Sequence, residues 1–304
     1  MGLPVIIDTD VGTDVDDMWA LAFALRCPEL DIRLITTCTG DVEYRAALVA
    51  KLLEVAGRTD IPIGLGLPLD SAPEPQKAWI EDYQLNLYPG VVIEDGVGAI
   101  CDTINQSENP MTIIAIGPLP NIAAALQRAP SIIENSKFIG MHGSLRIGYL
   151  GAPKPMKEYN VKQHALSCKS VFEAGWEKEI TPLDTCGNII LTGDNFQRVR
   201  NSADDLVRAV IENHLIWYEA VASSPVVGPF IKKMDPQVQS SILYDCVAIY
   251  MAFSSDGLVY EKLPISITED GMTVIDDDGS MVNCATSWSC LLYTSDAADE
   301  YSGV

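Results

Sequence analysis

The chain has 304 residues, of which 48% are hydrophobic, and its 42 acidic and 20 basic residues give a formal net charge of −22. The length and hydrophobic content predict a globular protein with a well-filled core and exclude a largely disordered chain. A surface this negative repels phosphate backbones and anionic lipid, so neither nucleic acid nor a membrane is expected as a partner, whereas a neutral small molecule or a cation is compatible.

Strand-like and helix-like segments alternate along the first half of the chain. Strands are predicted over 4–9, 31–38, 61–65, 111–116 and 137–141, and helices over 16–25, 42–56, 96–106 and 121–128. Gly57 is the expected C-cap of the second helix, and a loop rich in Pro and Gly is expected over 66–90. Strands separated by helices imply a mostly parallel sheet with helices on both faces.

The whole pattern predicts one domain over 1–288, with a doubly wound, Rossmann-like α/β fold, a mostly parallel (mixed) central sheet and an added helical region around 190–255. Residues 289–304 match neither the apolar rhythm nor the charge pattern before them. The string CLLYTSDAADE resembles an in-frame translation of a sequencing-library adapter. We therefore expect a non-native tail on a truncated C-terminus, with a natural flexible tail as the alternative.

The compartment is predicted from what the sequence lacks. It has no uninterrupted apolar run near the roughly 20 residues that span a bilayer. Met1 leads directly into a strand-like segment without the basic and apolar regions of a signal peptide. The eight cysteines are scattered without a CxxC pair, which predicts reduced thiols rather than disulfides or zinc ligands. A cytoplasmic protein is expected.

Five aspartates fall within ten residues, in the string DTDVGTDVDD that begins at Asp8. They follow the first predicted strand, at the edge of an open α/β sheet where ligands bind. Five mutually repelling anions in one turn are costly unless a cation neutralises them, and hard oxygen ligands select Ca²⁺ or Mg²⁺. Gly12 permits the sharp turn that lets Asp10 and Asp17 converge on one ion.

The alternative is a solvated acidic turn in which Asp14 or Asp16 caps the following helix. Capping accounts for one aspartate. Five aspartates directly after a buried strand favour the cation site.

The string IIDTDVGTDVDDMWALA resembles the N-terminal fingerprint of the inosine-uridine nucleoside hydrolases, DxDxGxDD followed by a helix. Two extra residues here separate Gly12 from the pair Asp16 and Asp17. Four later segments resemble the family in the same order: GPLPN at 117–121, EYN at 158–160, YD at 244–245 and GMTV at 271–274. The resemblance extends over nearly all of 3–288.

This resemblance implies a hydrolase that uses Ca²⁺ to cleave the N-glycosidic bond of purine or pyrimidine ribonucleosides, giving free base and ribose. It also implies a homodimer or homotetramer. The implied metal ligands are Asp10, Asp17, Asp245 and the backbone carbonyl of Pro120. Asp10 would also take the proton from the attacking water. The implied contacts to the ribose hydroxyls are Asp16, Glu158 and Asn160.

Two positions depart from the family pattern. Tyr244 stands where the family often has a histidine that serves as acid for the leaving base. A phenol is a poor acid at neutral pH, so Tyr244 is either a donor to the base or a packed aromatic. Asp41 stands where the family has an asparagine that contacts substrate. His142 is a further candidate substrate contact, with a structural role as its alternative. His214 and Trp217 lie on a predicted helix, where core packing is favoured over closure on a base.

Two other functions are compatible with parts of the sequence. Asp8 and Asp10 after an apolar strand resemble the nucleophile loop of haloacid dehalogenase phosphohydrolases, but that loop requires Thr or Val in place of Gly12. It also leaves Asp16 and Asp17 unexplained. The second alternative is a catalytically inactive nucleoside or sugar binder that kept the calcium site.

Overall fold

The computed structural model describes residues 2–69, 71–225 and 227–289. The predicted non-native tail, 289–304, lies outside the described residues except for Ser289. No helix in the described part of the chain is long and apolar enough to cross a membrane.

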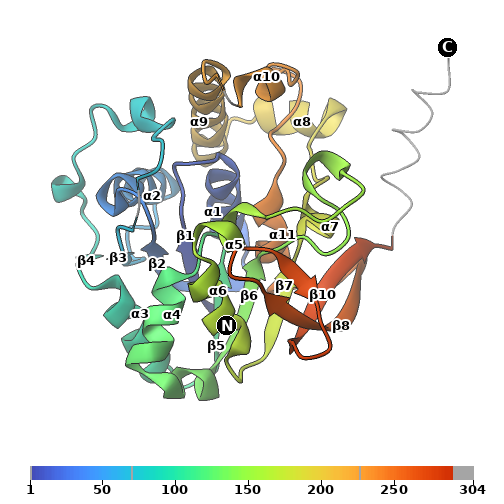
Figure 1. Cartoon of the computed structure of the whole chain (residues 1–304). Helices are drawn as coiled ribbons and strands as arrows, with labels where there is room; N and C mark the ends of the chain where they lie inside the picture. Colours follow the sequence, from blue (N-terminus) through green and yellow to red (C-terminus); the bar gives the residue numbers. More distant parts are fainter. Residues whose placement is uncertain (1, 70, 226, 290–304) are drawn as a thin grey trace, which may run out of the picture.

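One ten-stranded sheet organises the molecule, with strand order β4-β3-β2-β1-β5-β6-β7-β10-β8-β9 (Figure 1). The strands from β4 to β10 in this order are parallel, and β8 and β9 complete the sheet in antiparallel pairings. The mixed, mostly parallel sheet is thus confirmed. The strands are β1 (Leu3–Thr9), β2 (Leu30–Thr37), β3 (Ile63–Leu65), β4 (Val92–Ile93), β5 (Met111–Ala115), β6 (Ser136–Met141), β7 (Lys178–Thr181), β8 (Leu258–Ile267), β9 (Thr273–Ile275) and β10 (Ser280–Trp288).

Helices cover both faces of this sheet. They are α1 (Asp16–Arg26), α2 (Val42–Ala56), α3 (Gly96–Asn105), α4 (Pro120–Arg128), α5 (Tyr159–Gln163), α6 (Ala165–Glu173), α7 (Leu183–Cys186), α8 (Gly193–Arg200), α9 (Asp205–Ala222), α10 (Gly228–Ile231) and α11 (Tyr244–Met251). The last four form the added helical region predicted over 190–255, and α8, α9 and α10 gather at the top of the view in Figure 1.

The alternation of side chains along β1 explains the two layers. Val5 and Ile7 point into the core formed with α1, α2, α9 and α11, whereas Ile6 points into the core formed with α3, α4 and α6. All three side chains are fully buried. A strand buried on both faces reads as a continuous apolar run, which is why β1 and β5 were recognisable in the sequence.

The predicted elements agree with the structure to within two residues at each end, and Gly57 ends α2 in the left-handed conformation, with φ 67°. One expectation needs correction. The segment 66–90 is not structureless, because it contains two 3-10 turns, Lys77–Ile80 and Leu85–Leu87, and buries Trp79 at 3% exposure. The short strand Val92–Ile93 was not predicted, since two residues carry no recognisable periodicity.

Candidate active site

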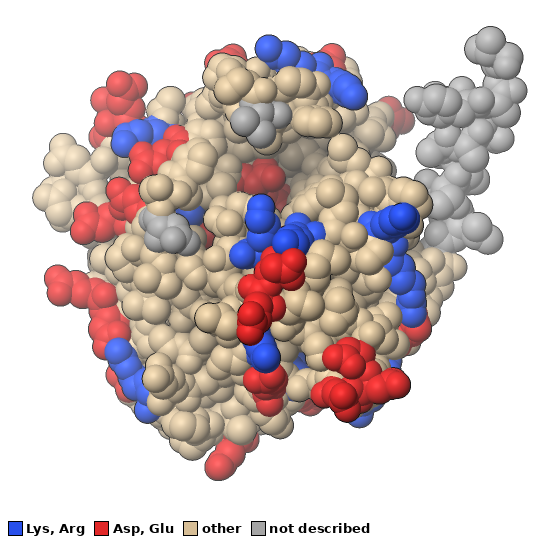
Figure 2. All heavy atoms as spheres, viewed as in Figure 1, with Lys and Arg blue, Asp and Glu red and all other residues tan. Residues whose placement is uncertain are grey.

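The candidate site lies at the point where the strand order reverses. β1 has β2 on one side and β5 on the other, and the chain after β1 and the chain after β5 leave the sheet at the same edge. A crevice outside the carboxyl ends of such strands is the usual ligand site of doubly wound folds. The aspartate string follows β1, and GPLPN follows β5. Figure 2 shows a recess with acidic side chains at its bottom, below α9 and α10.

Three carboxylates from distant parts of the chain meet at this edge. Asp16 and Asp17 begin α1, and Asp245 lies in the first turn of α11. Each offers an oxygen within 4.8 Å of the other two, and all three are no more than 4% exposed. Burial, followed by the neighbouring negative charges, raises the pKa of each carboxyl well above its usual range. Such a group is stable as three anions only when a cation joins it.

Asp10 adjoins this group without being a member of it. Its side chain is buried, and its charge raises the pKa of Asp16, Asp17 and Asp245. Burial also raises the pKa of Asp10 itself, while the positive charge of Arg45 opposes that rise. Among the carboxyl groups of this site, Asp10 and Asp17 thus have the buried positive charge of Arg45 nearby.

Asp8, the first aspartate of the string, has a structural role, because hydrogen bonds hold its buried carboxylate. Asp8 is fully buried and accepts hydrogen bonds from Thr36 Oγ1 at 2.5 Å and from Asn121 Nδ2 at 2.8 Å. Asn121 also donates to the carbonyl of Thr37 and accepts from the amide of Leu67. The asparagine of the GPLPN segment thus ties together β1, β2 and the loop after β3. This role was not recognised in the sequence.

The capping alternative for the acidic turn is wrong. The residue before α1 is Val15, and no side chain caps this helix. Asp14 is exposed, and its carboxylate accepts the amide of its neighbour Val15 at 2.7 Å. Asp17 instead accepts from Thr9 Oγ1 at 2.5 Å. The two carboxylates at the start of α1 point inward toward Asp245 rather than serving the helix end.

Glu158 and Asn160 lie on the far side of β5, around the start of α5. The Glu158 carboxylate is buried and accepts the amides of Gly143, Asn160 and Val161 at 2.7–3.1 Å. Burial nonetheless raises its pKa to about 7. Asn160 Nδ2 donates to the carbonyls of Ile116 and Met141, which follow β5 and end β6. Both side chains are thereby fixed at the same sheet edge as the aspartates.

Tyr244 is the first residue of α11, directly before Asp245. Its ring meets the ring of Tyr149 edge to face, with centroids 6.1 Å apart and planes at 83°. Burial raises the pKa of Tyr244 further above 10, and the charges of Asp14 and Asp16 add to the rise. The Tyr244 phenol therefore keeps its proton at neutral pH. The hydroxyl of Tyr149, in turn, accepts the amide of Tyr159 at 2.8 Å.

Two other predicted residues have local roles in the structure. Asp41 is exposed and caps α2, accepting the amides of Glu43 and Tyr44 at 3.0 Å. His142 is fully buried against Phe138 and Phe172, with Nε2 3.1 Å from the carbonyl of Gly117. Burial lowers the pKa of His142 to about 3, so this imidazole is neutral. These environments favour a structural role for His142. Asp41 serves as a helix cap in addition to its predicted contact with substrate.

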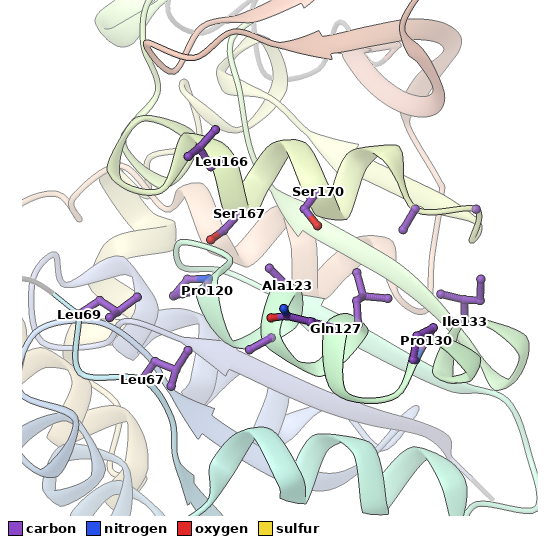
Figure 3. Close-up of a pocket in the computed structure, with 14 residues that line it drawn as sticks. Leu67, Leu69, Pro120, Ala123, Gln127, Pro130, Ile133, Leu166, Ser167 and Ser170 are labelled. Atoms are coloured by element: carbon purple, nitrogen blue, oxygen red, sulfur yellow. The ribbon is translucent and has the colours of Figure 1, made fainter.

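Pro120 is the first residue of α4, just beyond the end of β5. Its ring also lines an apolar groove of about 770 Å³ between α4 and α6 (Figure 3). Among the described residues, those lining this groove carry no charge. The groove is therefore separate in chemistry from the carboxylate group. His214 and Trp217, on α9, are buried and stack on each other at 6.2 Å, as the core-packing alternative predicted.

Two important polar residues were missed in the sequence. Asp184 accepts the amides of Leu145, Arg146 and Ile147 at 2.8–3.2 Å and so shapes the loop that carries Tyr149. Arg45 is a fully buried arginine of α2, bonded to the turn that follows β1. Both resemble surface residues in the sequence, because a single charged residue gives no local sign that it is buried.

A doubly wound fold with buried carboxylates at its switch point is typical of metal-dependent enzymes of the α/β class. Residues 5–296 match the family described as inosine-uridine preferring nucleoside hydrolase. Because this match covers nearly the whole chain, the chain belongs to that family. The family and enzyme class predicted from the sequence are confirmed, and the haloacid dehalogenase alternative is ruled out.

The relatives agree with this assignment. The non-specific ribonucleoside hydrolase RihC of Klebsiella pneumoniae is 32% identical over 205 residues, which cover 64% of this chain and 66% of that protein. The probable uridine nucleosidase 2 of Arabidopsis thaliana is 27% identical over 290 residues, covering 88% of this chain and 83% of that protein. The solved structure of a plant nucleoside hydrolase shares the fold, with TM-score 0.76, 20% identity and 95% of each chain covered.

Proposed function

We propose that this chain hydrolyses the N-glycosidic bond of ribonucleosides, releasing ribose and a free purine or pyrimidine base, and that Ca²⁺ is its cofactor. The observation that carries the proposal is the convergence of Asp16, Asp17 and Asp245 within 4.8 Å of one another, buried at the switch point of the sheet. The side-chain donors are all carboxylate oxygens. These are hard oxygen ligands, which suit Ca²⁺ better than they suit most transition metals.

The proposed metal ligands are Asp10, Asp17, Asp245 and the carbonyl of Pro120. The raised pKa values of the buried carboxyls support a resident cation, because without one the group must retain protons. When bound, the cation supplies Lewis acidity and a fixed seat for water and sugar hydroxyls. The Asp16 and Asp245 carboxyl groups lie within 4.8 Å of each other, which would place Asp16 beside the ion, where its carboxylate would accept from a ribose hydroxyl.

The remaining roles follow from the positions of the side chains. Asp10 would accept the proton of the attacking water, and the nearby Arg45 charge favours the ionised carboxylate that this step needs. Glu158 and Asn160 would fix the ribose from the β5 and β6 side. Holding the sugar in this way favours the flattened, positively charged ring that forms as the bond to the base breaks.

Tyr244 would assist the departing base by a hydrogen bond from its hydroxyl. Its raised pKa argues against full proton transfer, since a phenol that is harder to ionise is a weaker acid. The edge-to-face contact with Tyr149 holds the ring in place. Asp41 would contact the substrate from the loop after β2, in addition to capping α2. His142 would hydrogen-bond to the carbonyl of Gly117 rather than contact the substrate.

The deciding experiment measures free ribose from a panel that includes inosine, uridine and cytidine, with and without a calcium chelator. Ribose release that the chelator stops and added Ca²⁺ restores is the expected result. Calcium-dependent nucleoside binding without ribose release would instead establish the inactive binder. Release that is indifferent to the chelator would refute the metal site.

The proposed compartment is the cytoplasm and the proposed assembly is a homodimer or homotetramer. The seven cysteines of the described residues are all unpaired, as is typical of a reducing compartment. Cell fractionation and light scattering of the purified chain test these two proposals separately. A secreted protein or a monomer would contradict them.

A further inference from the structure

The turn between β1 and α1 is held from outside by side chains. Tyr44 and Arg45, neighbours in α2, both contact it: the Tyr44 hydroxyl donates to the carbonyl of Gly12 at 3.1 Å, and the Arg45 guanidinium donates to the carbonyls of Asp10 and Val11. Gln76 Nε2 donates to the carbonyl of Asp14 at 2.5 Å. Four carbonyls in this stretch of five residues are therefore fixed by side chains from elsewhere.

Arg45 holds two of these four carbonyls. Its side chain is 1% exposed, and each of its three nitrogens is engaged. Nε donates to the carbonyl of Thr39 at 2.8 Å, Nη1 donates to the two carbonyls of the turn, and Nη2 donates to Thr13 Oγ1 at 2.9 Å and Thr39 Oγ1 at 3.4 Å. An arginine has five N–H donors, and five acceptors surround this one.

None of these five acceptors is a carboxylate, although Asp10 and Asp17 lie close enough for the charge of Arg45 to act on them. The guanidinium N–H groups instead bond to main-chain carbonyls and threonine hydroxyls, and so fix the shape of the main chain. The space around it is also restricted, because a Cβ on Gly40 would lie 3.1 Å from Nη2, and a Cβ on Gly12 would lie 2.6 Å from the ring of Tyr44. The turn and the start of α2 are thus packed against each other.

We propose that Arg45 is a positioning residue that holds the turn at residues 10–13 in the shape that lets Asp10 and Asp17 face the same cation. The inference rests on the metal site proposed above. It assigns to α2, which contributes no proposed metal ligand, the task of building that site. Three bonds of Arg45 go to this turn: to the carbonyls of Asp10 and Val11 and to the hydroxyl of Thr13.

The effects of shape and charge on calcium affinity have opposite signs, so substitutions separate them. Removing a positive charge beside an acidic group strengthens cation binding, whereas releasing the turn weakens it. Arg45→Lys keeps the charge and loses the planar fork. Arg45→Met loses both. If charge alone mattered, the lysine variant would bind Ca²⁺ like the wild-type chain, and the methionine variant would bind it more tightly.

The test is calorimetric titration of the metal-free chain with calcium chloride alone, supported by circular dichroism to verify folding. We expect Arg45→Lys to weaken calcium binding by about 10- to 100-fold, the range for residues that support metal ligands. We expect Tyr44→Phe, which removes the hydroxyl's bonds to the carbonyl of Gly12 and to the amide of Gln76 but no charge, to weaken it by about two- to tenfold. Arg33→Lys, the same change at an exposed site on β2, is the matched control and should leave affinity unchanged.

Unchanged affinity in folded Arg45→Lys, with only a lower melting temperature, would overturn the inference and leave the metal site intact. Tighter binding by Arg45→Met would assign Arg45 a purely electrostatic effect and also overturn it. If Arg45→Met fails to fold, the lysine and Tyr44→Phe variants decide the question. Absence of calcium binding by the wild-type chain would overturn the proposed metal site, and this inference with it.

Discussion

The carboxyl groups of Asp16 and Asp245 have oxygens within 4.8 Å of each other, although one lies at the start of α1 and the other at the start of α11. Two carboxylate anions this close repel each other and have only acceptors to offer, so without a cation the pair favours retaining a proton. Burial raises the pKa of both groups. A cation bound beside them takes over the role of that proton, which couples metal binding to pH and to folding.

In calcium-free buffer, the folded chain should lose stability as the pH rises above about 4. Unfolded aspartates ionise near 3.9, whereas the buried pair ionises at higher pH, so the folded state binds the extra protons. Each group costs up to about 1.4 kcal/mol for each pH unit in that window. Calcium should restore stability most strongly at the high-pH end. Calorimetric melting curves with and without calcium measure both effects, and a melting temperature at pH 8 that ignores calcium would contradict the prediction.

Asp10→Asn should abolish turnover while the fold is retained. The substitution keeps the size of the side chain and removes the proposed proton acceptor, which typically contributes about 10²- to 10⁴-fold to a rate. Steady-state ribose release, with circular dichroism as the folding check, measures the loss. Asp102→Asn, the same change at an exposed aspartate of α3, is the matched control. Equal activity of Asp10→Asn and the wild-type chain would remove Asp10 from the mechanism.

We expect kcat/KM to rise with pH around an apparent pKa of about 7, as Glu158 ionises. Burial raises the pKa of this carboxyl to about 7, and only the ionised form leaves both oxygens free to accept from ribose as well as from the three amides. A pH profile on inosine from about pH 5 to 9 measures it. In Glu158→Gln the rising limb should be absent. If the rising limb persists unchanged in Glu158→Gln, another group is responsible for it.

Tyr244→Phe should lower kcat by about tenfold, the value of one hydrogen bond, with little change in KM. A loss of several orders of magnitude would instead indicate full proton transfer by the phenol. Tyr149→Phe serves as the control, because it keeps the ring that packs on Tyr244 at 6.1 Å and removes a hydroxyl that bonds to the amide of Tyr159. Single-turnover rates on substrates with good and poor leaving groups distinguish these outcomes.

Asp41→Ala should lower stability by about 1 kcal/mol, because the carboxylate caps α2 through the amides of Glu43 and Tyr44. Asp41→Asn should keep that stability, since asparagine is as good a cap. Urea unfolding measures both variants. The same pair tests the predicted substrate contact: a change in KM in the stable asparagine variant would support it, and an unchanged KM would reduce Asp41 to a helix cap.

The sequence by itself determined most of the elements and their order. Strands such as β1 and β5 are buried on both faces, so their burial is evident from a short apolar run. Helix α1 is marked by its periodicity, and α2 by its periodicity and by its end residues Asp41 and Gly57. The sequence also identified the cluster of aspartates after β1, because their repulsion is a local fact. The strand Val92–Ile93 was too short to leave such a signal.

Only the tertiary structure decided which of these carboxylates meet. Asp245 joins Asp16 and Asp17 because α11 packs against α1, a contact that no local pattern encodes. The same holds for Arg45 and Asp184, whose burial depends on main-chain carbonyls and amides supplied from other elements. Periodicity reports which face of an element is buried. It does not report which buried polar groups find partners across the core, since those partners are fixed by packing between distant segments.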